Sequence, residues 1–75
     1  MSRNEKIAKL TSAIREWRGI WNPNRGVWAQ PPKEKAVFKV DRWLKELGRP
    51  DPDGDILAIG EFKTTEDMNT WIRNL

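Results

Sequence analysis

Apolar residues near the N-terminus recur at helical spacing. The stripe comprises Ile7, Leu10, Ile14 and Trp17. Intervals of three and four residues place these side chains on one face of an α-helix. Ser2 and Glu5 precede the stripe with the S-x-x-E spacing of a capping box. Gly19 is the natural end of this helix, so the pattern predicts a first helix that buries Trp17 in the core.

Residues 19–30 pair two short β-prone runs with a turn. Residues 19–21 and 26–29 flank the sequence Asn-Pro-Asn-Arg, which has turn chemistry throughout. Two such runs around a four-residue loop predict a β-hairpin, with Trp21 and Trp28 on one face and Arg25 at the turn. A continued helix followed by a loop is the alternative, because Trp21 remains in phase with the first stripe.

The clearest helical pattern lies between Pro32 and Gly48. Its apolar positions fall within about 120° of the helix circumference at about 100° per residue. They are Ala36, Val37, Val40, Trp43, Leu44 and Leu47. Gly48 followed by Pro50 is a standard C-terminal stop. A second helix with one buried face is therefore expected.

The last third of the chain reads as a turn, a strand and a helix. Residues 51–55 are polar and turn-like, and residues 56–62, ILAIGEF, form a short apolar run that predicts a buried strand. Thr64 or Thr65 then caps a final helix. The inward positions of that helix are Met68, Trp71, Ile72 and Leu75.

Together these elements predict an α+β fold in the order α-β-β-α-β-α. Residues 1–75 would form a single small domain, in which helices cover a three-stranded, largely antiparallel sheet. A domain of this size is only marginally stable, and this chain has no cysteine for a disulfide. Its five tryptophans, each able to bury on the order of 200 Å², would supply much of the apolar core.

Composition argues against catalysis and against a bound cofactor or metal. The chain lacks histidine and cysteine, which are the commonest bases, nucleophiles and zinc ligands. No nucleotide-binding or nucleophile-elbow motif occurs. Asp51, Asp53 and Asp55 have the spacing of a calcium loop, but Ile56 and Phe62 occupy the positions that require glycine and glutamate. We therefore expect a protein that is not an enzyme.

No apolar run approaches the roughly 20 residues needed to cross a bilayer. The N-terminal residues also lack the apolar stretch of a signal peptide. A cysteine-free chain suits a reducing compartment. These features predict a soluble, cytoplasmic protein with no membrane partner.

Charge is unevenly distributed along the chain. Residues 1–49 hold 12 Lys and Arg against 5 Asp and Glu, whereas residues 50–75 hold 2 against 6. This asymmetry indicates a basic face for nucleic acid or an acidic protein, or else a dipolar surface without a function. The predicted second helix carries much of this charge opposite its apolar face, at Lys35, Lys39, Arg42 and Arg49.

Phe38 is the most specific candidate for a binding residue. It lies about 160° from the centre of the apolar face of the second helix. A helix that buries one face would leave this ring in water, where it could stack on a base or anchor a protein partner. Its basic neighbours would be Arg42, Lys45 and Arg49. In the alternative, the second helix is covered on both sides and Phe38 is part of the core.

The phrases WRGIW, RGVWAQ and IGEFKTTED resemble the plant ethylene-response-factor type of DNA-binding domain. The resemblance covers about 30 residues. It implies a three-stranded sheet whose Trp and Arg side chains contact DNA. This chain departs from that family by placing a helix between the second and third strands and by making the third strand apolar.

Two functions remain after these exclusions. The first is a small protein-interaction module, a regulatory or accessory protein that binds another protein or itself. The second is a nucleic-acid-binding protein that uses the basic helix face and the hairpin. Nothing indicates a small-molecule substrate. The binding residues expected in one or both cases are Phe38, Lys35, Lys39, Arg42, Arg49, Arg25, Trp21 and Trp28, with Arg18 as a further phosphate contact.

Overall fold

The computed structural model describes residues 1–19 and 34–75. These residues form four α-helices and one short 3₁₀ helix, and none of them forms a β-sheet. The elements are α1 (Arg3–Arg18), the 3₁₀ helix η2 (Glu34–Ala36), α2 (Val37–Glu46), α3 (Pro52–Gly60) and α4 (Thr65–Arg73). The predicted α+β fold is therefore wrong. The predicted hairpin of residues 19–30, apart from Gly19, lies outside the described residues.

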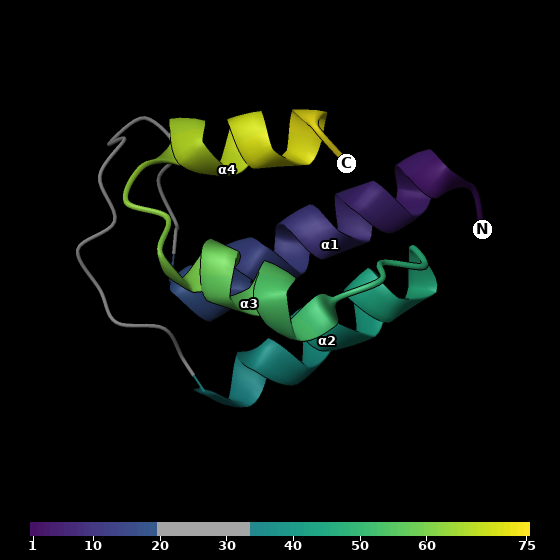
Figure 1. The fold of residues 1–75 in the computed structure, drawn as a ribbon, viewed down its shortest axis with the longest axis horizontal. Helices are drawn as coiled ribbons and strands as arrows, with labels where there is room; N and C mark the ends of the chain where they lie inside the picture. Colours follow the sequence, from purple (N-terminus) through teal and green to yellow (C-terminus); the bar gives the residue numbers. More distant parts are fainter. Residues whose placement is uncertain (20–33) are drawn as a thin grey trace.

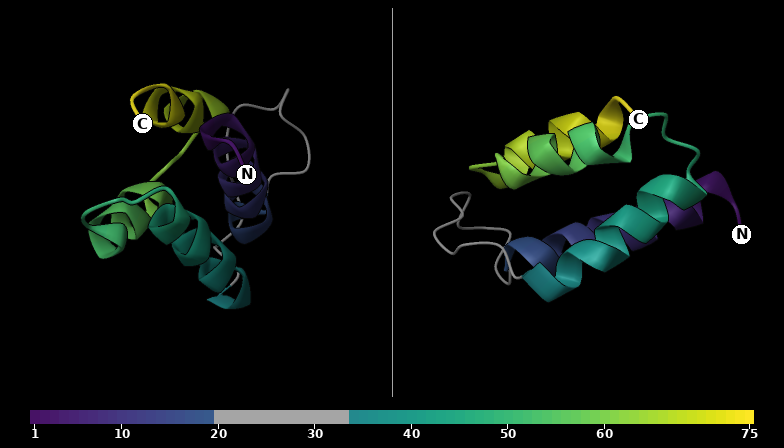
Figure 2. Two further views of the ribbon diagram at one scale, coloured as in Figure 1. Left: turned by 90° about the vertical axis from the view of Figure 1, so that its right-hand side faces the viewer. Right: turned by 60° about the horizontal axis from the view of Figure 1, so that its bottom comes forward.

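Successive helices run in alternating directions along the long axis of the molecule (Figure 1). α2 packs against α1 on one side and against α3 on the other, while α4 lies beyond α1 and α3. Side views show that the helices cross at an angle and are not parallel (Figure 2). The middle position of α2 between two helices leaves its outer side uncovered.

α1 has the boundaries that its sequence pattern indicates. The Ser2 side chain accepts a hydrogen bond from the Glu5 backbone N–H at 3.2 Å, which caps the first turn. Gly19 ends the helix in the left-handed conformation, with φ of 69°. Glycine adopts this conformation without the steric cost that a Cβ atom would bring.

α2 ends just before Gly48, the residue that the sequence predicts as its C-terminal stop. Gly48 has a φ of 74°, and the Arg49 backbone N–H donates to the Leu44 carbonyl at 3.1 Å. This bond closes the last turn of the helix and directs the chain back toward α3. The buried positions Ala36, Val40 and Leu44 confirm the predicted apolar face.

The predicted strand at residues 56–62 is instead most of α3 and the turn that follows it. Asp51 caps this helix by accepting from the Gly54 backbone N–H at 3.1 Å, and Pro52 occupies the first helical position. A short apolar run has no periodicity that distinguishes a buried strand from a helix. Here the cap and the proline before the run start a helix.

α4 begins at a reciprocal cap. The Thr64 side chain accepts from the Asp67 backbone N–H, and the Asp67 carboxylate accepts from the Thr64 backbone N–H. The same carboxylate accepts from the Lys63 backbone N–H at 2.9 Å. This capping confirms Thr64, one of the two residues expected to start the last helix.

All four α-helices and η2 contribute to one hydrophobic core. Trp17 is 7% exposed, as its place in the first stripe predicts. Gly60 of α3 lies against its ring, because a Cβ atom built at Gly60 would stand 3.5 Å from Trp17 Cη2. Six side chains are fully buried: Leu10, Ile14, Val40, Leu44, Ile59 and Met68.

Candidate interaction surface

Phe38 projects from the outer side of α2. It lies in the first turn of the helix, between the buried residues Ala36 and Val40 in the sequence. Because α1 and α3 cover the other sides of α2, the Phe38 side is open, and the residue is 75% exposed. The alternative in which Phe38 belongs to the core is wrong.

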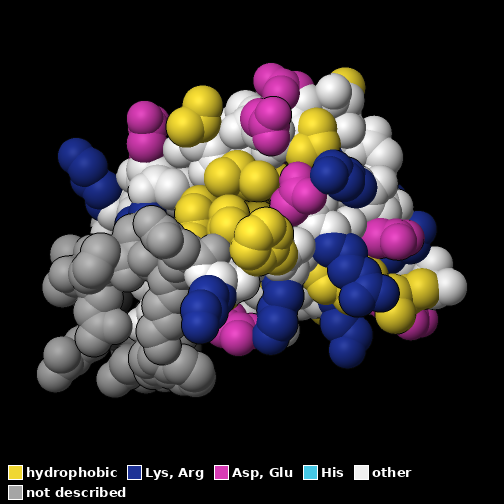
Figure 3. All heavy atoms as spheres, turned by 90° about the horizontal axis from the view of Figure 1, so that it is seen from below, with side chains coloured by type: hydrophobic (Ala, Val, Ile, Leu, Met, Phe, Trp, Pro, Cys, Tyr) yellow, Lys and Arg dark blue, Asp and Glu magenta, His cyan; other side chains and the backbone are white. Residues whose placement is uncertain are grey.

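Leu57 adds a second exposed apolar side chain on the neighbouring helix. It lies in the middle of α3 and is 72% exposed, whereas Ile59, two residues later, is fully buried. The face of the molecule formed by α2 and α3 shows a patch of hydrophobic side chains (Figure 3). Phe38 and Leu57 are therefore apolar groups that two adjacent helices present to solvent.

Basic side chains on the Phe38 face of α2 are exposed as well. Lys35 and Arg42 lie three residues before and four residues after Phe38, so helical geometry places them on the same face. The Arg42 guanidinium lies over the Trp43 ring, 5.4 Å from its centroid. Within residues 1–19 and 34–75, neither Lys35 nor Arg42 forms an ion pair.

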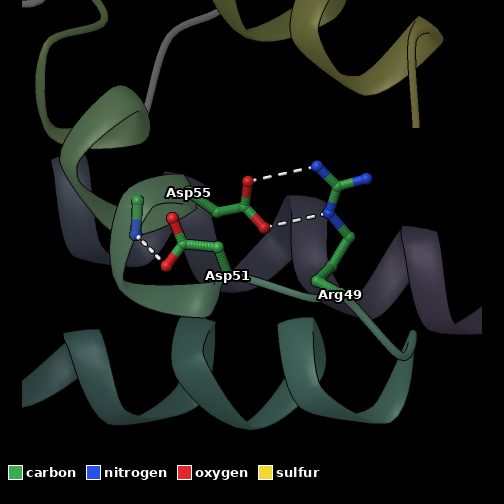
Figure 4. A network of polar contacts seen from close by, with 4 residues as sticks. Arg49, Asp51 and Asp55 are labelled. Atoms are coloured by element: carbon green, nitrogen blue, oxygen red, sulfur yellow. Dashed lines mark hydrogen bonds and ion pairs between the residues drawn. The ribbon is translucent and has the colours of Figure 1, made fainter.

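Two other basic residues predicted to bind a partner form ion pairs within the chain. Lys39 bonds to both carboxylate oxygens of Glu16 on α1 at 3.0 Å. Arg49 binds Asp55 with two hydrogen bonds of 2.9 and 3.1 Å (Figure 4), and its guanidinium lies over the Trp71 ring. The hydrogen bond to Asp55 raises the pKa of Arg49. Both residues thus stabilise contacts between helices.

The outer side of α3 carries acidic residues on either side of Leu57. Asp53 and Glu61 lie four residues before and after it, and both are exposed. The hydrogen bond from Lys45 of α2 to Asp41 is the main cause that raises the pKa of Lys45, and the negative charge of Asp53 adds to it. In Figure 3, most Lys and Arg side chains near the hydrophobic patch lie along its lower edge, with an acidic side chain among them, and several Asp and Glu side chains lie above the patch, with a basic side chain beside them.

Arg18 does not belong to the surface. It is 7% exposed, and its guanidinium donates to the carbonyl oxygens of Gly60 and Phe62 at the end of α3. Burial lowers the pKa of this guanidinium from its ordinary value. The predicted role of Arg18 as a phosphate contact is therefore replaced by a structural one. The other predicted contacts, Trp21, Arg25 and Trp28, lie outside the described residues.

The aspartates with calcium-loop spacing also have internal partners. Asp51 caps α3 and Asp55 holds Arg49, so their carboxylates point to different groups (Figure 4). Across the described residues, no three acidic side chains are placed to bind a metal ion. None of the described helices is both long and apolar enough to cross a membrane.

Comparisons with protein-family models, with curated protein sequences and with solved structures give no match for this chain. The resemblance to the ethylene-response-factor type of domain has no support from the fold, because the expected third strand lies in α3. The candidate site therefore depends on the geometry of α2 and α3 alone.

Sequence reasoning identified Phe38, Lys35 and Arg42 but not the α3 half of the surface. Leu57 was assigned to a buried strand, and Asp53 to a solvated turn. The signal that could have found them is Asp51 followed by Pro52, an N-cap and a first-turn proline. Continuing a helix from that cap places Asp53, Leu57 and Glu61 in one row.

Proposed function

We propose that this protein is a small, non-catalytic interaction module that binds a protein partner through the outer face of α2 and α3. The observation that carries the proposal is the 75% exposure of Phe38 on a helix whose other sides are packed. A large aromatic side chain gains no stability for the monomer in water, but it can anchor an interface by filling a pocket in a partner.

The residues around Phe38 support the same function. Leu57 extends the apolar area to the next helix, and Lys35 and Arg42 provide a polar border. Protein interfaces commonly combine an apolar centre with a polar rim, and arginine is enriched in them. The exposed part of this surface resembles that arrangement on a small scale.

Partner capture by immobilised protein tests the proposal. We expect Phe38→Ala and Arg42→Glu to weaken the capture of partners from a cell extract, with Phe38→Ala reducing it at least about tenfold. Thermal stability should be nearly unchanged, because both side chains are exposed. The matched control is Asn69→Ala, an exposed substitution on α4. Identical partner sets for the wild type and Phe38→Ala would contradict the proposal.

Nucleic-acid binding has less support from the arrangement of charges. Of the four basic residues expected on α2 and just after it, Lys39 and Arg49 are neutralised by Glu16 and Asp55. A phosphate-binding surface usually has a denser basic stripe. Titration of mixed-sequence DNA and RNA at several salt concentrations tests this function. Affinity that falls steeply with salt would favour it, and absence of binding at low salt would exclude it.

A further inference from the structure

The surface formed by α2 and α3 contains two rows with opposite charge and the same layout. The α2 row is basic, apolar and basic, and it consists of Lys35 of η2 with Phe38 and Arg42 of α2. The α3 row is acidic, apolar and acidic, and it consists of Asp53 and Leu57 of α3 with Glu61, which caps the end of this helix. All six side chains are exposed, and the two helices are antiparallel neighbours (Figures 1 and 2).

We infer that a second copy of this chain is the partner, with α2 of each copy packed against α3 of the other. The inference rests on the proposed interaction function and names the occupant of that surface. Phe38 of one copy would meet Leu57 of its partner, and the charges on either side of Phe38 would meet those on either side of Leu57.

Two-fold symmetry makes this pairing possible with a single surface. Consider a two-fold axis that lies in the contact plane, runs parallel to the helices and passes midway between α2 and α3. Rotation about this axis places α2 of the second copy opposite α3 of the first, and α3 of the second copy opposite α2 of the first. Each α2 then faces an α3, in the antiparallel sense in which the two helices already pack within one chain. The basic row therefore meets the acidic row twice in the same dimer.

Charge complementarity favours a second copy over an unrelated protein. A partner for the α2 row must present acid, an apolar group and acid along a helix, and α3 of the same chain does so. The α3 row requires the reverse pattern, which α2 supplies. The contact area of two short helices is at the low end for specific interfaces, so the dimer should be weak and should dissociate on dilution.

Sedimentation equilibrium of the whole chain is the first test. Between roughly 1 μM and 1 mM protein at low salt, the mean mass should rise from that of the 8.8 kDa monomer toward twice that value. The equilibrium should shift toward monomer in high salt, because exposed charges are then screened. Phe38→Ala should abolish most of the mass increase, whereas Asn69→Ala should not.

Charge reversal tests the pairing of the rows. The basic-row variant carries Lys35→Glu and Arg42→Glu, and the acidic-row variant carries Asp53→Lys and Glu61→Lys. Each variant alone brings like charges together at both contacts, so its dimer should weaken by more than about tenfold. An equimolar mixture of the two should recover dimers, because both contacts are complementary in the mixed pair. Recovery would also show that both variants are folded.

A variant with Arg15→Glu and Arg73→Glu has the same net charge as the basic-row variant but changes exposed residues on α1 and α4. Labelled acidic-row variant should bind the basic-row variant at least about tenfold more tightly than it binds this control. Equal binding of the two would mean that net charge alone drives association, and it would overturn the pairing.

Other outcomes separate this inference from the proposed function. A chain that stays monomeric at every concentration, but still captures another protein in a Phe38-dependent way, would overturn self-association and leave the interaction function standing. Dimers that are insensitive to Phe38→Ala and to both charge reversals would place the contact elsewhere and overturn the inference. A wild-type chain that neither dimerises nor captures another protein would contradict both proposals.

Discussion

The junction between α1 and α3 and the outer face of α2 reverse the usual places of charged and apolar side chains. At the junction, the charged residue Arg18 is 7% exposed. On the outer face of α2, the apolar residue Phe38 is 75% exposed. Both positions are unusual, since arginine is rarely buried without partners and a large aromatic ring is usually covered.

The difference lies in what the molecule itself supplies to each side chain. The Arg18 guanidinium has the carbonyls of Gly60 and Phe62 as acceptors, so its burial links α1 to the end of α3. Phe38 lies on the side of α2 that neither α1 nor α3 covers. The buried charge therefore belongs to the fold, whereas the exposed ring is available to a partner.

The largest expected effect compares two apolar residues of α3. Ile59→Ala removes a fully buried side chain and should cost about 2–5 kcal/mol of unfolding free energy. Leu57→Ala removes an exposed one and should cost less than about 0.5 kcal/mol. Residues two apart share one face of a strand but not of a helix. Chemical denaturation of both variants checks this contrast, and similar losses would contradict the helical assignment.

A smaller effect is expected at the buried charge. Arg18→Met keeps much of the side-chain volume but removes the donors to the Gly60 and Phe62 carbonyls. The loss should be about 1–3 kcal/mol, because buried acceptors are left without these bonds. Arg15→Met on the exposed side of α1 is the control and should be nearly neutral. An unchanged unfolding free energy for Arg18→Met would show that the hydrogen bonds from Arg18 to these two carbonyls do not stabilise the junction.

The smallest effect concerns the Asp67 cap at the start of α4. The Lys63 backbone N–H, with further bonds at Thr64, lowers the pKa of Asp67 from its ordinary value of 3.8. Folding therefore favours the carboxylate, so the stabilisation is present above that value and is lost as the pH falls through the lowered pKa. Asp67→Asn should melt below the wild type at neutral pH.

Thermal melting of both proteins at a series of pH values measures this effect. The gap between the two melting temperatures should close as the medium becomes acidic, because protonation of Asp67 removes the charge that the substitution also removes. A gap that is independent of pH would show that the charge of the cap contributes nothing to stability.

Local patterns predicted most of the helices. Ser2, Gly19, Gly48 and Thr64 act within a few residues of their own position, and the ends of α1, α2 and α4 agree with them. The prediction of a strand at residues 56–62 was wrong, because an apolar run of this length suits a buried strand and a helix equally. The three-stranded sheet depended on this strand, so its prediction was wrong as well.

In the candidate site, too, positions set within one helix could be predicted, whereas contacts between helices could not. Helical geometry on α2 placed Phe38 opposite the apolar face, but it left open whether another element would cover the ring. The engagement of Lys39 and Arg18 depends on partners 23 and more than 40 residues away in the sequence. Such contacts are set by the packing of helices, so the sequence of either helix alone does not show which basic residues remain at the surface.

The unfolding free energy of Phe38→Ala, measured beside Leu44→Ala in the same helix, tests the central claim most directly. Leu44 is fully buried, and its substitution should cost about 2–5 kcal/mol. If the outer face of α2 is reserved for a partner, Phe38→Ala should cost less than about 0.5 kcal/mol in the monomer. A loss of about 3–5 kcal/mol for Phe38→Ala would place the ring in the core and contradict the account.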